Sequence, residues 1–532
     1  MGAIIQITLT TDLSPLPPVH LAAMPDAFSS HSESHDAAWP RIVIVGAGIS
    51  GLCLAMRLKK AGFDSLTILE KSHDIGGTWL DNTYPGCGCD VPSMLYSFSF
   101  ALNTDWSRKY APQAEILQYF RDCCERFAIR PHIQFGTAVS TARWDEDRSH
   151  WTVTTDAGET IDCDFFVSAV GQLSRPALPA IEGIDSFRGP AFHAARWDHA
   201  FDARDKRIAV IGNGASAVQI VPKLAHRARQ VSVLQRSANW ILHRHDHRYT
   251  RPWRWFYRWV PFAARLQRLL MYLFFELRIL CYNRRTLLNN CFTAWARFRM
   301  RRAAPEKLHS QLIPQFPAGC KRVLLSNDYL QALHHENVQL VTDPIERITP
   351  EGIRTSAGNL PLDAIVYATG FKASEFLYPM EILGRDGVRL NETWKRRPLT
   401  YLGILAPEFP NFFMLYGPNT NLGHNSIIFM VECQVRFILR CLKLLARRDC
   451  GVLEVRRDAT EEFDQMLQRH LRKKVWNGWV ASWYKTDQGD ITNNWCRSTL
   501  AYWWHTRKPA EEALQLSPRR DCRTVERTPV AR

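Results

Sequence analysis

The sequence lacks every cysteine arrangement that marks a zinc site or a secreted disulfide framework. It has 14 cysteines in 532 residues, but Cys87 and Cys89, like Cys123 and Cys124, stand too close together to serve as either. A secretory signal is also missing, because Met1 to Leu13 has neither a basic start nor a long apolar core. We therefore expect a reduced protein that resides in the cytoplasm.

Acidic residues are nearly absent between His243 and Arg302. This segment holds 14 arginines and no lysine against only Asp246 and Glu276, a net charge of +12 out of +15 for the whole chain. Such a charge raises the question of nucleic-acid binding, but the segment carries no motif of a known nucleic-acid-binding fold. We expect no nucleic-acid partner.

Long hydrophobic runs are missing too. Glu276 and Arg278 interrupt the most apolar stretch well before the roughly 18 residues that a bilayer crossing requires. Apolar residues recur there at helical spacing, which predicts an amphipathic helix. We expect a helical subdomain that packs on the body of the protein by this stripe. The alternative is a surface that contacts an anionic membrane or attracts an anionic cofactor. The stripe consists of Leu266, Leu269, Leu270, Leu273, Phe274, Leu277 and Leu280.

What the sequence does contain is a glycine turn between an apolar strand and a helix, in RIVIVGAGISGLCLAMRLKKAG. Gly46 permits the tight turn, Gly48 lets a diphosphate approach the backbone, and Gly51 lets the helix pack close to the strand. The following strand ends at Glu70, whose carboxylate can accept hydrogen bonds from both ribose hydroxyls. This segment predicts a site for a dinucleotide with a free ribose.

The same pattern returns in RIAVIGNGASAVQIVPKL. Gly212 and Gly214 repeat the first two glycines, and Ser216 lies at the start of the following helix. Arg236 stands where the first copy has Glu70. Because a carboxylate repels a 2′-phosphate and an arginine attracts one, this second copy predicts an NADPH site.

Each copy closes with a buried strand and a small-residue turn, DFFVSAVG in the first and DAIVYATG, ending at Gly370, in the second. The repeat predicts an α/β fold with two Rossmann-like dinucleotide-binding domains, for FAD and NADPH, the second inserted in the first, and with a helical insertion. The predicted order is a disordered lead (1–39), FAD domain (40–185), NADPH domain (186–245), basic helical insertion (246–316), NADPH domain (317–371), FAD domain (372–508) and disordered tail (509–532).

Three further motifs surround the glycine turns. GGTWLDNTYPGCGCD follows the second strand of the first unit, FRGPAFHAARWD precedes the second glycine turn, and PAGCKRVLLSNDYLQAL lies within the second unit. Together, over roughly residues 40–505, they make the chain resemble the Baeyer–Villiger monooxygenases. The first motif resembles that family's flavin-contacting signature and implies contacts to FAD from Gly77, Thr78, Trp79, Tyr84 and Asp90.

The other two motifs acquire roles through the same resemblance. Arg322 would be the catalytic arginine, held by Asp90, with Lys321 near the NADPH phosphate. A fixed guanidinium can stabilise negative charge that develops during reaction. The family's long fingerprint is matched at each of its defined positions, which implies an element that couples NADPH binding to domain arrangement. These positions are Phe187, Gly189, His193, Trp197 and Asp198.

Two histidines have alternative interpretations. His193 could transfer a proton, although its place in the fingerprint favours structural coupling. His424, in YGPNTNLGHNS, could be a catalytic base. We instead expect a histidine at a helix start that makes local hydrogen bonds.

The resemblance implies an NADPH-dependent flavoprotein monooxygenase that binds FAD. It would use O2, through a C4a-peroxyflavin, to insert one oxygen atom beside a ketone carbonyl, giving an ester or lactone. An N- or S-oxygenating flavin monooxygenase is the alternative, against which Trp197 and Asp198 argue. A non-catalytic redox sensor would leave Arg236, Lys321 and Arg322 without a use. Neither the identity of the ketone nor the oligomeric state follows from the sequence.

Overall fold

Two five-stranded parallel sheets form the framework of the protein, whose computed structural model describes residues 40–260, 262–478, 482–486 and 488–519. The strand order is β19-β7-β1-β2-β3 in the first sheet and β13-β10-β9-β17-β8 in the second. The first sheet contains β1 (Ile42–Val45), β2 (Leu66–Leu69), β3 (Ile133–Gln134), β7 (Phe165–Ser168) and β19 (Phe412–Met414). The second contains β8 (Ala191–His193), β9 (Arg207–Ile211), β10 (Gln230–Leu234), β13 (Val338–Val341) and β17 (Ala364–Tyr367).

The second sheet is nested within the first along the chain. All of its strands lie between β7 and β19, which are neighbours in the first sheet. The predicted α/β fold with one Rossmann-like unit inserted in the other is therefore confirmed. The sequence-based domain boundaries stay predictions, and the predicted lead over residues 1–39 lies outside the described residues.

Each of the two units has the same hydrogen bond at the start of its first strand, from an arginine backbone to an aspartate side chain. The backbone N–H of Arg41 donates to Asp164 Oδ2 at 2.7 Å, and that of Arg207 donates to Asp363 Oδ2 at 2.7 Å. The side chain of Arg207 hydrogen-bonds the same carboxylate and holds the pKa of Asp363 at about 2. In both units an aspartate before the closing strand thus fixes the strand that leads into the glycine turn.

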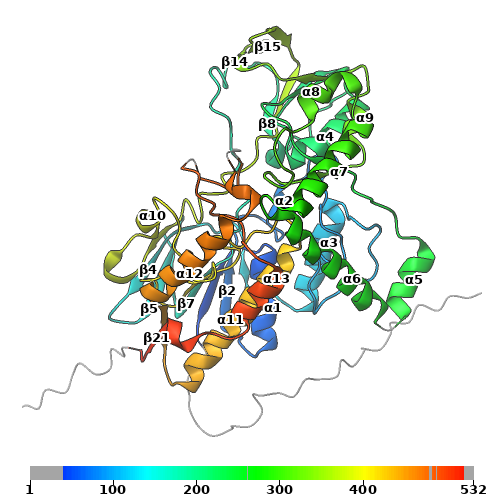
Figure 1. The fold of residues 1–532 in the computed structure, drawn as a ribbon. Coiled ribbons are helices and arrows are strands. Elements are labelled where there is room, and N and C mark those ends of the chain that lie inside the picture. The colour runs from blue at the N-terminus through cyan, green and yellow to red at the C-terminus, as the bar shows by residue number, and fades with distance from the viewer. Residues whose placement is uncertain (1–39, 261, 479–481, 487, 520–532) are drawn as a thin grey trace, which may run out of the picture. The chain divides into compact units, whose positions relative to one another are not determined.

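Helices and smaller sheets surround these two units. Helix α11 packs against α1 and α13, as Figure 1 shows. None of the described helices has the length and the apolar run that crossing a bilayer requires. The helices are α1 (Ile49–Lys60), α2 (Thr78–Asp81), α3 (Gln113–Arg126), α4 (Ala215–Ala225), α5 (Arg251–Trp259), α6 (Ala263–Leu277), α7 (Leu287–Ala303), α8 (His309–Leu312), α9 (Tyr329–Ala332), α10 (Leu390–Thr393), α11 (Ile427–Arg447), α12 (Arg457–Leu471) and α13 (Thr499–Thr506). The smaller sheets contain β4 (Val139–Asp145), β5 (His150–Thr155), β6 (Thr160–Cys163) and β18 (Glu381–Leu383); β14 (Ile345–Thr349), β15 (Gly352–Thr355) and β16 (Gly358–Pro361); and β11 (Ile241–Leu242) with β12 (Leu324–Leu325).

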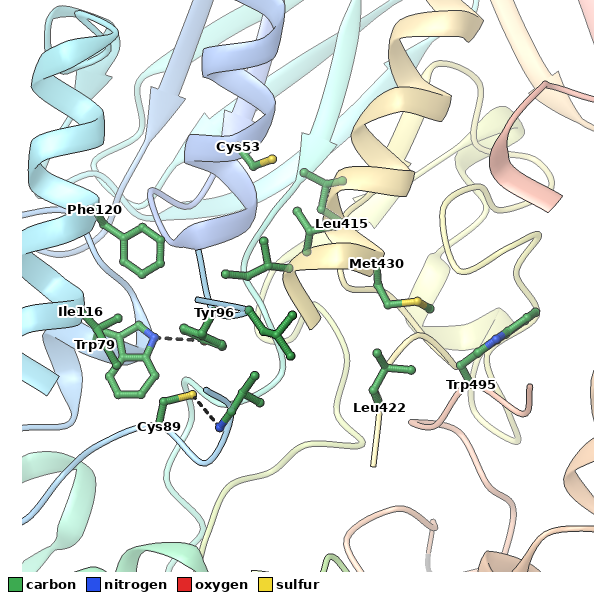
Figure 2. Close-up of a cluster of buried hydrophobic side chains, with 14 of the residues drawn as sticks. Cys53, Trp79, Cys89, Tyr96, Ile116, Phe120, Leu415, Leu422, Met430 and Trp495 are labelled. Atoms are coloured by element: carbon green, nitrogen blue, oxygen red, sulfur yellow. Dashed lines mark hydrogen bonds between the residues drawn. The ribbon is translucent and has the colours of Figure 1, made fainter. Parts of the chain in front are cut away.

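One buried cluster joins parts of the chain that are far apart in sequence. Figure 2 shows Trp79, Tyr96 and Phe120 in the same hydrophobic region as Met430 and Trp495. Trp79 Nε1 donates to the Tyr96 hydroxyl at 3.1 Å, so the indole is both packed and hydrogen-bonded. The predicted flavin-contacting stretch is therefore anchored in the core.

The prediction of a disordered tail over residues 509–532 is wrong for its first part. Leu514–Ser517 form strand β21, which pairs antiparallel with β20 (Val452–Val455). The polar composition of the segment hid a strand whose backbone hydrogen bonds are made to a partner about 60 residues earlier. Residues 520–532 lie outside the described part of the chain.

The predicted packing of the basic insertion is also wrong. Its helical character and amphipathic spacing are confirmed, but the apolar stripe on α6 and the following turn faces solvent. The exposed fractions are 56% for Leu266, 51% for Leu269, 55% for Leu270, 44% for Leu273, 66% for Phe274, 66% for Leu277 and 46% for Leu280. The opposite face of α6 binds the body of the protein, and on it polar side chains lie beside the buried Ala264 and Phe275.

Glu276 is the most deeply buried of these polar side chains. Its carboxylate accepts hydrogen bonds from Asn425 Nδ2 at 2.9 Å and Thr499 Oγ1 at 2.7 Å, and it lies 3.5 Å from His424 Nε2. Burial alone would raise the pKa of Glu276. Its contacts with His424, Thr499 and Asn425 outweigh burial and lower that pKa from 4.5 to about 2. The carboxylate is therefore an anion that holds three distant segments together.

We expect Glu276→Gln to destabilise the protein in a pH-dependent manner. Because the folded-state pKa is depressed, the contribution of Glu276 is complete above about pH 5 and is lost as pH falls from the unfolded pKa towards about 2. The shift corresponds to about 3 kcal/mol at neutral pH. Thermal unfolding midpoints of parent and variant should therefore differ at pH 7 and converge at low pH. Glu375→Gln, which removes a half-exposed carboxylate, serves as the control; a gap of equal size at all pH values would contradict this role of Glu276.

Candidate active site

The first glycine turn joins β1 to α1 in the predicted conformation. Gly46 has a φ of +105°, and a Cβ built on Gly51 would lie 1.9 Å from the carbonyl oxygen of Gly46. Only glycine fits this close approach between strand and helix. Glu70 is buried at the end of the next strand and accepts hydrogen bonds from the backbone N–H groups of Ala47 and Ser72 at 2.7 and 2.9 Å. Its carboxylate thus lies directly at the turn.

A second pair of glycines faces this turn. Gly76 and Gly77 have φ values of +125° and +52°, and a Cβ built on Gly77 would lie 3.2 Å from the Cα of Gly48. Gly77 immediately precedes the short helix α2, in which Thr78 is the first residue and Trp79 is buried. Two backbone turns without side chains therefore meet at the N-terminal end of α1.

The second glycine turn, between β9 and α4, has the same backbone. Gly212 has a φ of +112°, and a Cβ there would lie 2.4 Å from the carbonyl oxygen of Ala368. A Cβ built on Gly214 meets no described atom within 4 Å, so this turn is open on its outer side. Ser216 is partly exposed in the first turn of α4, and Gly370 follows the neighbouring strand β17.

Two cations lie beside this open turn. Arg236 is exposed just after β10, and Lys321 Nζ donates to the hydroxyl of the adjacent Ser237 at 2.6 Å. Burial, and then the charge of Arg236, lowers the pKa of Lys321. Neither cation forms an ion pair with a described residue. The arrangement concentrates positive charge and a hydroxyl donor where an anion would be stabilised.

Asp90 and Arg322 form a two-pronged ion pair, as the sequence predicts. Arg322 Nε donates to Asp90 Oδ2 at 2.9 Å, and Nη2 donates to Oδ1 and Oδ2 at 3.0 and 2.7 Å. About a quarter of each side chain is exposed. The charge of Asp90 raises the pKa of Arg322. Burial alone would raise the pKa of Asp90, but the charge and hydrogen bonds of Arg322 outweigh burial and lower that pKa. Nη1 makes no hydrogen bond with a described residue, so one edge of the guanidinium is held and one nitrogen is available.

Two tyrosines that the sequence did not single out lie close enough to this ion pair to interact with its charges. Burial raises the pKa values of Tyr416 and Tyr484, and the charge of Arg322 opposes that rise. The Tyr416 hydroxyl donates to Asn421 Oδ1 at 2.7 Å, and Asn421 in turn donates to Asn494 Oδ1 at 2.7 Å. The two asparagines thus hold the Tyr416 hydroxyl in place near Arg322.

Gln219 on α4 connects the two glycine-turn units and was missed at the sequence level. Its side-chain amide accepts from the N–H of Gly88 at 3.2 Å, donates to the carbonyl of Gly88 at 3.0 Å, and accepts from the Tyr84 hydroxyl at 3.1 Å. A Cβ on Gly86 would lie 2.7 Å from the Gln219 carbonyl oxygen. The sequence carries no pattern that predicts these contacts for a glutamine one turn into a helix.

Part of the fingerprint segment is strand β8 at the edge of the second sheet. A Cβ on Gly189 would lie 2.7 Å from both the Asp363 carbonyl and the Phe187 ring, so the glycine lets this segment approach β17. His193 is buried, its Nδ1 accepts from the Ala195 N–H at 3.1 Å, and burial lowers its pKa. These contacts support a structural role for His193.

The end of the fingerprint lies against the predicted flavin-contacting stretch. Arg196 Nη1 is 3.3 Å from Asp81 Oδ1, and a cavity of about 240 Å³ lies between Trp197 and the region of Ser72 to Thr83. Trp197 packs edge-on against Phe192 at 5.1 Å, while Asp198 caps the following turn through the Ala200 N–H. The fingerprint therefore touches both units.

His424 does not make the local hydrogen bonds expected of a helix-start histidine. It is buried, and its Nε2 faces Glu276, a residue 148 positions earlier. Burial lowers its pKa. The partner comes from the helical insertion, which no local pattern around His424 could reveal.

Comparisons with known proteins agree with this geometry. Residues 40–271 match the model of the flavin-binding monooxygenase-like family. The chain is 39% identical to the FAD-binding monooxygenase ktnD of Aspergillus niger over 90% of this chain and 82% of that protein. It is 37% identical to a Baeyer–Villiger monooxygenase of Pseudomonas aeruginosa over 84% of this chain and 85% of that protein. The crystal structure of OTEMO in complex with FAD and NADP is similar with a TM-score of 0.82 and 29% identity, covering 90% of this chain and 99% of that one. The chain belongs to the Baeyer–Villiger monooxygenases, within the flavin-binding monooxygenase-like family.

Proposed function

We propose that this enzyme binds FAD at the first glycine turn and NADPH at the second, and that it converts a ketone to an ester or lactone. The overall reaction consumes ketone, O2, NADPH and a proton and yields ester, NADP+ and water. The observation that carries the proposal is the guanidinium of Arg322, fixed by Asp90 along one edge with Nη1 left available.

The residues at the first turn fit FAD. The close approach of Gly48 and Gly77 leaves backbone without side chains where a diphosphate would lie, at the N-terminal end of a 12-residue helix. The buried carboxylate of Glu70 would accept hydrogen bonds from ribose hydroxyls while it retains its backbone donors. Thr78, Trp79 and Tyr84 extend from this turn towards Asp90 and would contact the rest of the cofactor.

The residues at the second turn fit NADPH. Gly214 and Ser216 would receive the diphosphate at the open start of α4. Arg236, Ser237 and Lys321 would bind the 2′-phosphate through charge-assisted hydrogen bonds. Burial and, second to it, the charge of Arg236 lower the pKa of Lys321, and a bound dianion would relieve the repulsion between the two cations.

Arg322 would act on charge that develops on the reacting oxygen atoms. When bound, FAD would supply the redox chemistry that activates O2 for insertion. The Asp90 ion pair fixes the guanidinium before reaction, so little reorganisation is required when negative charge appears. Because the pKa of Arg322 is raised, it stays a cation throughout the cycle. Tyr416, Tyr484 and the Asn421–Asn494 pair would exclude water on that side.

Two alternatives predict different products. An N- or S-oxygenating enzyme of the same family would act on amines or sulfides and would have less need of a fixed cation beside the oxygen atoms. A non-catalytic redox sensor would turn over no substrate. The reduced, cytoplasmic setting expected from the sequence stays part of the proposal.

We expect the FAD-loaded enzyme to form ester and consume NADPH and O2 in equal amounts with a suitable ketone. Linear, cyclic and aryl ketones should be compared, with product identification by mass spectrometry. An amine and a sulfide of similar size serve as controls. NADPH consumption accompanied only by hydrogen peroxide for every ketone, with clean oxygenation of the amine or sulfide, would contradict the proposal.

A further inference from the structure

Helix α6 directs three polar side chains inward, beside the buried Ala264 and Phe275. Arg268, Tyr272 and Glu276 follow one another at intervals of four residues, so they lie on one face of the helix. Arg268 donates to the carbonyl of Ser97 at 2.9 Å, and Tyr272 shares a hydrogen bond of 2.7 Å with the hydroxyl of Thr499. These polar contacts, together with the packing of Phe275, attach the helix to the body, and the leucine stripe is left outside.

The neighbouring helices continue this apolar surface. On α5, Trp253, Trp255 and Trp259 are 54%, 62% and 54% exposed. Helix α13 begins beside α6, because Thr499 contacts both Tyr272 and Glu276, and its Trp504 is 56% exposed. We call the exposed apolar side chains of α5 and α6, with the arginines among them, the α5–α6 surface. A surface of this size and composition is uncommon on a protein whose apolar residues meet only water.

The charge of the α5–α6 surface is almost wholly positive. Arg251, Arg258 and Arg265 are exposed on α5 and α6. The two acids of the basic segment do not compensate them: Asp246 pairs with Arg108, and Glu276 is buried against His424. Arg258 and Arg265 lie over the rings of Trp259 and Phe262, so cations and aromatic rings are interleaved.

We propose that the α5–α6 surface docks on an anionic lipid membrane, with α6 lying in the plane of the interface. Exposed leucines would enter the acyl boundary, tryptophans would lie at the headgroup level, and arginines would bind lipid phosphates. A helix of 15 residues is about 22 Å long and lies along a membrane without crossing it. The inward contacts of Arg268, Tyr272 and Glu276 hold the apolar stripe outward for this purpose.

Charge selects the membrane over a second copy of the chain. In a symmetric dimer built on this surface, the same arginines would face each other across the interface. Like charges placed together oppose such an association, whereas an anionic lipid surface attracts every one of them. The attraction falls with salt because the Debye length shortens.

Vesicle sedimentation with the FAD-loaded full chain tests the proposal. Vesicles of phosphatidylcholine alone are compared with vesicles that also contain phosphatidylserine, at low and at high salt. We expect binding to the mixed vesicles that weakens as salt rises. Arg258→Gln with Arg265→Gln should reduce the affinity by roughly 30-fold, and Leu270→Ser with Leu273→Ser by more than about tenfold. Leu178→Ser and Arg229→Gln remove an exposed leucine and an exposed arginine outside the insertion and should leave binding unchanged.

NADPH oxidation in solution, measured for every variant, shows that each is folded and active. Three results would overturn the membrane assignment. One is the absence of binding to either kind of vesicle. Another is binding that the leucine pair does not affect. The third is a dimer detected by light scattering that the leucine pair dissociates, which would assign the surface to a second copy.

Discussion

Arg322→Ala is expected to lower the rate of ketone oxygenation by about a thousandfold, because one preorganised cation beside developing negative charge contributes an effect of that order. NADPH should still reduce the flavin at nearly the parental rate, since the two cations at the second glycine turn are untouched. Stopped-flow absorbance separates the two half-reactions, and product analysis quantifies the ester. NADPH would then be oxidised without ester formation.

Two further variants distinguish charge from geometry at this position. Arg322→Lys keeps the positive charge but cannot reproduce the two-pronged contact with Asp90, so it should recover only a small part of the activity. Asp90→Asn keeps the guanidinium but removes the charged residue that holds it. Its ketone oxygenation rate should lie between those of Arg322→Ala and the parent enzyme. If Arg322→Ala made ester at the parental rate, Arg322 would not be the group that stabilises the reaction.

Arg236→Ala is expected to raise the KM for NADPH by about 10- to 100-fold, the usual cost of losing hydrogen bonds to a charged group. The KM for NADH should hardly change, because NADH lacks the 2′-phosphate. The measurement is the rate of flavin reduction against the concentration of each cofactor. Lys321→Met should give a smaller effect in the same direction, since Lys321 reaches the site through Ser237.

Arg229→Ala is the matched control for this experiment. Arg229 is an exposed arginine just before β10, whereas Arg236 lies just after that strand. Loss of the Arg229 side chain should leave the KM for NADPH and the KM for NADH unchanged. Equal losses for NADPH and NADH in Arg236→Ala would mean that the arginine supports the fold of the turn and does not bind the phosphate.

Much of the site was predictable because it rests on local chemistry. Positive φ values at Gly46 and Gly212, and the steric need for Gly51, follow from how a strand turns into a helix at close range. The pairing of Asp90 with Arg322 could also be anticipated, although only through resemblance to a family. Spacing alone could not bring together residues more than 200 positions apart.

The errors have a common physical origin. Helical periodicity identified the leucine stripe of α6, but periodicity does not say which face of a helix meets the protein. That choice was made by distant partners, Ser97 for Arg268 and Asn425 and Thr499 for Glu276. The strand β21 was missed for the same reason, because its hydrogen bonds depend on β20 and not on its own composition.

The sequence by itself determined the two nested dinucleotide units, their opposite charges at the ends of the second strands, and the residues that surround the glycine turns. These depend on backbone sterics and on charge at short range, which neighbouring residues specify. Only the tertiary structure decided that Gln219 clamps Gly88, that Tyr416 and Tyr484 lie near Arg322, and that α6 presents its leucines outward. Each of those features is a contact between segments far apart in the chain, and such contacts exist only after the chain has folded.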